Sequence, residues 1–267
     1  MGRKILYTEC ETIELMVIIL SEDVSIVEIG EVGEGPIIIT GLPDVGLVGS
    51  IAAFHLASKM HMEDVGFLES DLLPPIVALY NGVPKPPVRI LKSGSLVAIV
   101  SETAIPATAV SKVSKAIVEW ASKKRAKLII AIGGIAVEER YKLEKPIVYV
   151  AASSREAVED LKSKGMEILE RGYLVGPYAL IMRLASLHGL VAIGLLAQSF
   201  FNYPDPEAAA SVLESLSNII GLKIDVSELR EKGEEIRLAA RDLMRRTEGE
   251  LTRMRKTQEY DVPPLHV

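Results

Sequence analysis

The 267-residue sequence predicts an α/β fold, a three-layer α/β/α sandwich around a mainly parallel β-sheet. Short β-branched runs alternate with longer helical segments along most of the chain, and this alternation is typical of a sheet with helices on both faces. Hydrophobic residues make up 49% of the chain, enough for a substantial core. We expect residues 1–224 to form this core domain, residues 225–257 a long charged helix and residues 258–267 an extended tail.

Short extended segments dominate the first half of the chain, because most apolar runs there are too short for a helix. A helix begins near Ser50, and a second one carries apolar residues at helical spacing from Val110 to Ala121. Asn81 to Pro87 contains one glycine and three prolines, which predicts an exposed, stiff loop suited to a contact surface. Strands are predicted over residues 13–20, 24–29, 37–40, 65–68, 76–80, 88–91 and 96–101.

Capping residues mark the helices of the second half. Ser153 and Glu156 form a capping box that opens a helix ending at Gly165. Asp205 caps a later helix, whose first residue is a proline and which ends before Gly221. A further helix is predicted over residues 177–188, and strands over residues 128–132, 147–150 and 190–196.

Asp225 and Glu228 predict a second capping box, which opens one long charged helix through about Lys256. Its carboxylates lie mostly near the N-terminal end of the helix and its arginines near the C-terminal end, which is the arrangement that the helix dipole favours.

Leu229, Ile236 and Leu243 form an apolar stripe on this helix, which we expect to pack on the parent domain. The basic cluster Arg253–Lys256 lacks interleaved aromatic residues, so we interpret it as a solvated helix end.

The stretch from Ile37 to Ser50 predicts a buried strand, a tight glycine turn and a helix. A Walker A loop would need a lysine after its last glycine, but Gly46 is followed by a leucine. A dinucleotide fingerprint would need a glycine where Asp44 stands. We therefore interpret the glycines as serving the turn and a close contact between helix and strand.

The same turn, Gly41-Leu42-Pro43-Asp44-Val45-Gly46-Leu47-Val48-Gly49, resembles the signature of the archaeal proteasome assembly chaperone family. The resemblance spans roughly residues 15–240. Further similar segments follow in order along the chain. They are Leu73-Pro74-Pro75, Asn81-Gly82, Pro87-Val88-Arg89-Ile90, Ser101-Glu102, Trp120-Ala121, Ile132-Gly133-Gly134 and Asp205-Pro206-Glu207-Ala208-Ala209.

This resemblance implies a nucleoside-phosphorylase-like core and a non-enzymatic, chaperone-like protein that forms a homo-oligomer. It also implies proteasome α subunits as partners. Some members of the family end in a hydrophobic residue, a tyrosine and any last residue, a tail that inserts between α subunits. The corresponding residues here are Leu265, His266 and Val267, with histidine in place of tyrosine.

Composition excludes several classes of function. The net charge of −6 gives no basic field for nucleic acid. No histidine pair has the spacing that binds zinc on one helix face, and we expect no metal or cofactor. The chain has a single cysteine, no recognisable signal peptide and no apolar run that would cross the membrane. These features predict a cytoplasmic protein. The mean hydropathy of +0.27 predicts that some apolar surface lies between subunits.

An enzyme or a small-molecule-binding protein remains the alternative, with its site in a crevice near Gly41–Gly49. Asp44 and Glu102 each follow a predicted strand at the edge where open α/β sheets bind ligands. Both carboxylates also have structural interpretations. Asp44 would cap the following helix, and Glu102 would pair with Arg89 of the neighbouring strand. A third alternative is an adaptor whose partner is not the proteasome.

Overall fold

A computed structural model describes residues 16–19 and 23–256 of the chain. Its strands are β1 (Met16–Ile19), β2 (Ser25–Glu28), β3 (Ile37–Gly41), β4 (Glu63–Glu69), β5 (Ala78–Tyr80), β6 (Val83–Lys85), β7 (Val88–Ser93), β8 (Leu96–Ser101), β9 (Leu128–Ala136), β10 (Val148–Ala152), β11 (Glu167–Ile168) and β12 (Ala192–Ser199). The α-helices are α1 (Val48–Lys59), α2 (Ala107–Lys123), α3 (Arg155–Ser163), α4 (Pro177–Leu187), α5 (Pro206–Ile220), α6 (Ser227–Glu231) and α7 (Gly233–Arg253), with short 3₁₀ turns η1 (Val45–Leu47) and η2 (Arg140–Lys142). No helix among the described residues is long and apolar enough to cross a membrane.

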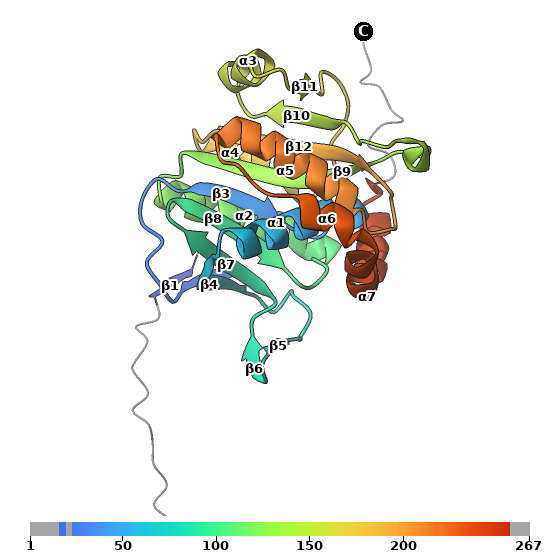
Figure 1. Cartoon of the computed structure of the whole chain (residues 1–267). Helices are drawn as coiled ribbons and strands as arrows, with labels where there is room; N and C mark the ends of the chain where they lie inside the picture. Colours follow the sequence, from blue (N-terminus) through green and yellow to red (C-terminus); the bar gives the residue numbers. More distant parts are fainter. Residues whose placement is uncertain (1–15, 20–22, 257–267) are drawn as a thin grey trace, which may run out of the picture.

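The centre of the molecule is a ten-stranded sheet in the order β1-β2-β4-β7-β8-β3-β9-β12-β10-β11 (Figure 1). The sheet is mixed, so the prediction of a mainly parallel sheet is wrong. Among the described strands, four neighbouring pairs are parallel and five are antiparallel. The two strands of a hairpin such as β7–β8 are antiparallel, because the chain reverses between them. The alternation of strands with helices also does not fix the direction in which β10 runs beside β12.

Helices cover both faces of the sheet. Successive residues of a strand point to opposite faces, and Ile38 packs in a cluster with Trp120 of α2 and Tyr178 of α4. Ile39 packs instead with residues of α1 and α5, among them Leu213. Both faces of the central strands are therefore buried, as expected for a sheet between two helical layers.

Two predicted boundaries differ from the structure. The cap of α3 is Ser154, whose hydroxyl accepts from the Ala157 N–H at 3.2 Å. The Ser153 hydroxyl instead donates to the Leu190 carbonyl and accepts from Ala192 N–H, so it ties β10 to the start of β12. The segment predicted as a stiff loop from Asn81 contains strand β6, paired with β5 in a small separate sheet.

The predicted long C-terminal helix is two helices, α6 and α7, with a break at Lys232. Gly233 follows the break. Because glycine has a low helix propensity, interrupting the helix at this position costs little free energy. The predicted packing of the apolar stripe is confirmed. Leu229 is buried in the same cluster as residues of α1 and α5, and Ile236 and Leu243 are partly buried against that cluster.

Candidate functional site at the glycine turn

The glycine turn is buried throughout, from Gly41 to Ser50. A Cβ at Gly41 would lie 2.2 Å from the Cβ of Ala53 in α1, and a Cβ at Gly49 would lie 2.6 Å from the carbonyl oxygen of Ile132 in β9. Any larger residue would therefore push α1 away from the sheet. The interpretation of these glycines as close-packing positions is confirmed.

Gly46 serves the turn itself. Its φ of 60° lies in the left-handed region, and a Cβ there would lie 1.9 Å from the hydroxyl oxygen of Ser199. The Gly46 carbonyl accepts from the N–H of Asp205, the residue that caps α5. The turn thus binds a neighbouring part of the chain through its backbone.

Asp44 makes no side-chain capping hydrogen bond to the helix that follows, so the capping interpretation is wrong. Its carboxylate is 1% exposed and points into the protein, where Gly134 N–H donates to Oδ2 at 3.4 Å. The ammonium nitrogen of Lys256 lies 3.0 Å from Oδ1. Asp44 therefore forms a buried ion pair with the last described residue of the chain.

Lys256 is itself buried and is held by two further groups. Its ammonium donates to the hydroxyl of Tyr178 at 2.7 Å and to the carbonyl of Val175. The nitrogen also lies 4.0 Å from the centre of the Tyr178 ring. The interpretation of the basic cluster as a solvated helix end is wrong for Lys256, because its ammonium is buried beside Asp44. No sequence signal shows which cation pairs with a buried carboxylate.

Burial and the ion pair act on the pKa of Asp44 in opposite directions. Removal of the carboxylate from water raises its pKa above the ordinary 3.8, and attraction by Lys256 opposes that rise. Lys256 therefore favours the ionised form of the carboxylate, and burial opposes it.

The side chains of Lys256 and Tyr178 cover Asp44, so the carboxylate is not presented to solvent. Each of the two covering residues is at most 2% exposed. A Cβ at Gly176 would lie 3.1 Å from the Lys256 nitrogen, so the backbone before α4 also closes over this point. A ligand that reached Asp44 would have to displace part of the chain.

Arg89 and Glu102 meet at a second place, between β7 and the end of β8. A guanidinium N–H of Arg89 donates to Glu102 at 2.8 Å, which confirms the predicted pairing. Arg89 also donates to Asp64 and to the hydroxyl of Tyr80, which in turn donates to Glu102. Asp44 and Glu102, predicted to share one crevice, therefore belong to two networks, with Asp44 in one and Glu102 and Arg89 in the other.

This second network shifts two pKa values. Burial and the hydrogen bond to Glu102 raise the pKa of Tyr80 to about 12. Burial would also raise the pKa of Asp64, but hydrogen bonds from Lys85 and Arg89 outweigh it and hold that pKa below 3.8. The network therefore stays charged and hydrogen-bonded at neutral pH.

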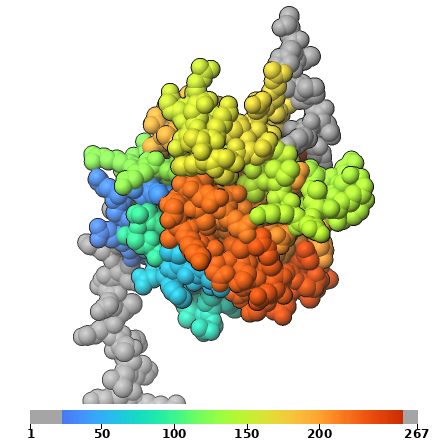
Figure 2. Space-filling view, turned by 45° about the horizontal axis from the view of Figure 1, so that its top comes forward, coloured from blue at the N-terminus to red at the C-terminus, as the bar shows by residue number. Residues whose placement is uncertain are grey.

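The C-terminal extension is bound to the core at both ends. At its start, His55 Nε2 of α1 donates to the Asp225 carbonyl at 2.7 Å, and Lys59 pairs with Glu228 at 2.9 Å. Near its end, the Glu250 carboxylate accepts from the N–H of Ala107, the first residue of α2. Figure 2 shows the segment, orange to red, packed continuously against the rest of the molecule.

The predicted partner-binding residues Leu265, His266 and Val267 lie outside the described residues. The segment that carries them follows directly after Lys256. In the part of the chain that is described, no group of three His, Cys, Asp or Glu side chains gathers as metal ligands would.

Residues 38–244, from β3 into α7, match the PAC2 family. This chain belongs to the PAC2 family. Pyrococcus furiosus PbaA, described as an archaeal homolog of proteasome-assembly chaperone, has a similar structure, with 31% identity and a TM-score of 0.80 over 85% of this chain and 98% of that one. Pyrococcus furiosus PbaB, described as an archaeal proteasome activator, gives 27% identity and a TM-score of 0.71 over 84% and 99%.

Among curated proteins, an uncharacterized protein of Methanocaldococcus jannaschii, MJ0106, is 30% identical over 234 residues, 88% of this chain and 94% of that protein. The family predicted from the turn motif is confirmed. The PAC2 match begins at the turn's own strand, whereas Lys256 lies beyond the matched residues.

Gly41→Ala should lower the free energy of unfolding by at least about 2 kcal/mol, because the new methyl group overlaps Ala53 and the Gly49 backbone. Gly249→Ala is the matched control, since this exposed helical glycine of α7 has open space around it. It should raise stability by about 0.5–1 kcal/mol. Denaturant unfolding measures both, and equal effects would contradict close packing at Gly41.

Lys256→Met should lower stability by about 3–5 kcal/mol at pH 8, because it leaves the Asp44 carboxylate buried without a cation. The folded-state pKa of Asp44 lies above the ordinary value of 3.8. The free-energy cost of burying this carboxylate without a cation is therefore absent below pH 3.8, where the group is protonated, and grows as the pH rises above 3.8. The loss should therefore be smaller at pH 5, and adding Asp44→Asn should recover part of it.

Lys59→Met, which breaks a partly exposed pair, is the control and should have a small effect. A loss for Lys256→Met that does not change between pH 5 and pH 8 would contradict the buried pair.

Proposed function

We propose that this PAC2 protein is a non-enzymatic, protein-binding factor of the chaperone type. In this proposal it forms a homo-oligomer and docks on proteasome α subunits through Leu265, His266 and Val267. The observation that supports the proposal is the buried Lys256, the last described residue before the tail, which is paired with Asp44 on the core. A tail held at its base loses less conformational entropy on docking than one that starts from a free helix.

The descriptions of the relatives support the same partner. PbaA is described as a homolog of a proteasome-assembly chaperone and PbaB as a proteasome activator, and both are similar to this chain over most of its length. In docking, Leu265 fills an apolar pocket, and the His266 ring takes the place of the tyrosine found in some family members. Histidine has a smaller ring and no phenol hydroxyl, so it reaches less far and binds more weakly than tyrosine.

The polar groups of the core support a protein-binding role over catalysis. Asp44 is engaged by Lys256, and Glu102 by Arg89 and Tyr80, so each carboxylate already has its partner within the chain. A ligand-binding function would require Lys256 and Tyr178 to leave the turn. Retention of a small molecule through purification would favour that alternative.

Removal of Leu265–Val267 should raise the dissociation constant for a purified archaeal proteasome α-subunit preparation at least about tenfold. His266→Tyr should lower it about tenfold, because the phenol restores reach and a hydrogen bond. Co-elution with light scattering, followed by titration, measures both. Glu259→Gln, a change elsewhere in the tail, is the control.

Binding that survives the truncation at full strength would place the contact on the folded domain. No binding by the full chain would overturn the α-subunit proposal and favour an adaptor for another partner.

A further inference from the structure

Strands β5 and β6 form a small hairpin, the arm, that stands out from the main body (Figure 1). One face of the arm is bound to that body. Tyr80 on this face accepts a hydrogen bond from Arg89, and Lys85 on the same face pairs with Asp64 at 2.7 Å. A two-stranded hairpin is only marginally stable in water, so these contacts keep the arm in one orientation.

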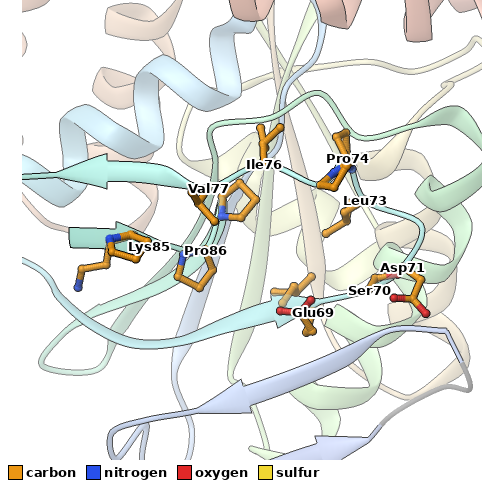
Figure 3. Close-up of a pocket in the computed structure, with 13 residues that line it drawn as sticks. Glu69, Ser70, Asp71, Leu73, Pro74, Ile76, Val77, Lys85 and Pro86 are labelled. Carbon is orange, nitrogen blue, oxygen red and sulfur yellow. The ribbon is translucent and has the colours of Figure 1, made fainter. Parts of the chain in front are cut away.

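The other face of the arm is apolar and borders a pocket of about 670 Å³ (Figure 3). Leu79 and Pro84 lie opposite each other in the two strands, so their side chains share this face. Leu79 is 69% exposed and Val77 is 62% exposed. Val77 and Pro84 also line the pocket. The apolar face of the arm and the wall of the pocket therefore form one surface.

The pocket lies where β4 and β7 separate. Their pairing ends at Phe67 and Arg89, and Glu69 beyond that point lines the pocket. Pro86 and Pro87 stand directly before β7 and have no N–H with which to extend the ladder. The carbonyl of Pro87 accepts instead from Glu102 N–H at 2.8 Å. The gap between the strands is thus built into the fold.

The pocket has an apolar side and an acidic side. Leu73 and Ile76 lie on one side, and Glu69 and Asp71 on the other (Figure 3). Neither carboxylate forms an ion pair with a residue that the structure describes, whereas Lys85 of the wall is already paired with Asp64. Charge complementarity therefore favours a cationic occupant and opposes an anionic one.

Prolines form much of the remaining wall and restrict the occupant further. Because proline has no backbone N–H, these residues provide no donors of the kind that bind phosphate or carboxylate groups. Their rings provide apolar contact, and their fixed φ limits collapse of the pocket. They are Pro74, Pro75, Pro84, Pro86 and Pro87.

We propose that the pocket and the apolar face of the arm together bind an extended segment of a partner protein in which apolar and basic residues alternate. Successive side chains of an extended chain point in opposite directions. The apolar side chains of such a segment contact Val77 and Leu79. Its lysines or arginines, on the opposite side, pair with Glu69 and Asp71.

The two halves of this surface have different roles in selecting the partner. Partly exposed ion pairs add little affinity by themselves but exclude segments of the wrong charge. Contact with the apolar face supplies affinity, at little entropic cost on the protein's side, because the arm is already held in place. A segment must therefore carry both features to bind well.

This second binding surface is separate from the tail, and the inference does not rest on docking to α subunits. Its test uses the full chain and synthetic peptides, whereas tail docking is measured with α subunits. Failure of one is therefore distinguishable from failure of the other.

Fluorescence anisotropy with three dye-labelled hexapeptides, capped at both ends, tests the surface. The first peptide alternates leucine with lysine, the second leucine with glutamate, and the third serine with lysine. The first should bind at least about tenfold more tightly than either of the others, because only it combines apolar contact with positive charge. No saturable binding of the first peptide, or equal binding of another, would overturn the proposal.

The double substitution Glu69→Lys with Asp71→Lys should raise the dissociation constant of the leucine-lysine peptide at least about tenfold, because the new charges repel it. Both positions are exposed, so circular dichroism should match that of the unchanged protein. Glu138→Lys with Glu144→Lys is the matched control. It changes the net charge equally at exposed positions that do not line the pocket. An equal loss in the control would show attraction by net charge alone and overturn the proposal.

Leu79→Ser should weaken binding of the same peptide at least about fivefold, because it removes apolar contact from the arm. Leu238→Ser is the control, since Leu238 is another strongly exposed leucine, on α7, and its substitution should leave binding unchanged. Unchanged binding by the Leu79→Ser variant would exclude the arm from the surface and overturn the proposal as stated.

Discussion

A buried ammonium and a buried carboxylate, Lys256 and Asp44, determine how the C-terminal extension is joined to the core of this PAC2 protein. Removing two charges from water costs several kcal/mol for each ion, and only close pairing with further hydrogen bonds offsets that cost. Tyr178, the Val175 carbonyl and Gly134 N–H provide those bonds. A conformation with the extension detached would leave the buried Asp44 carboxylate without its cation, so the ion pair couples the extension to the core.

The glycine turn makes this ion pair geometrically accessible. Close packing at Gly41 and Gly49 brings α1 onto the sheet, and the left-handed Gly46 directs the chain so that Asp44 points inward. The most recognisable motif of the chain is therefore a packing and anchoring element. A second buried cation, Arg89, organises the other polar network, which contains Asp64, Tyr80 and Glu102.

The sequence predicted most strands and helices, because short β-branched runs and caps such as Asp205 are local signals that tertiary packing preserved. It did not predict the direction of β10, which depends on pairing with the distant β12. The pairing of Glu102 with Arg89 was predictable from neighbouring strands. The pairing of Asp44 with Lys256 joins residues more than two hundred positions apart, and a basic cluster at a helix end resembles many solvated ones.

Hydrogen exchange at neutral pH, compared between the unchanged chain and Lys256→Met, tests most directly whether this ion pair holds the extension to the core. The amides of the last turns of α7, near Leu251, should exchange at least about tenfold faster in the variant, which corresponds to about 1.4 kcal/mol of local stability. Amides of η1 around Gly46 should lose protection together with them. Unchanged protection in both segments would contradict the account, because the extension would then be held by its other contacts without this ion pair.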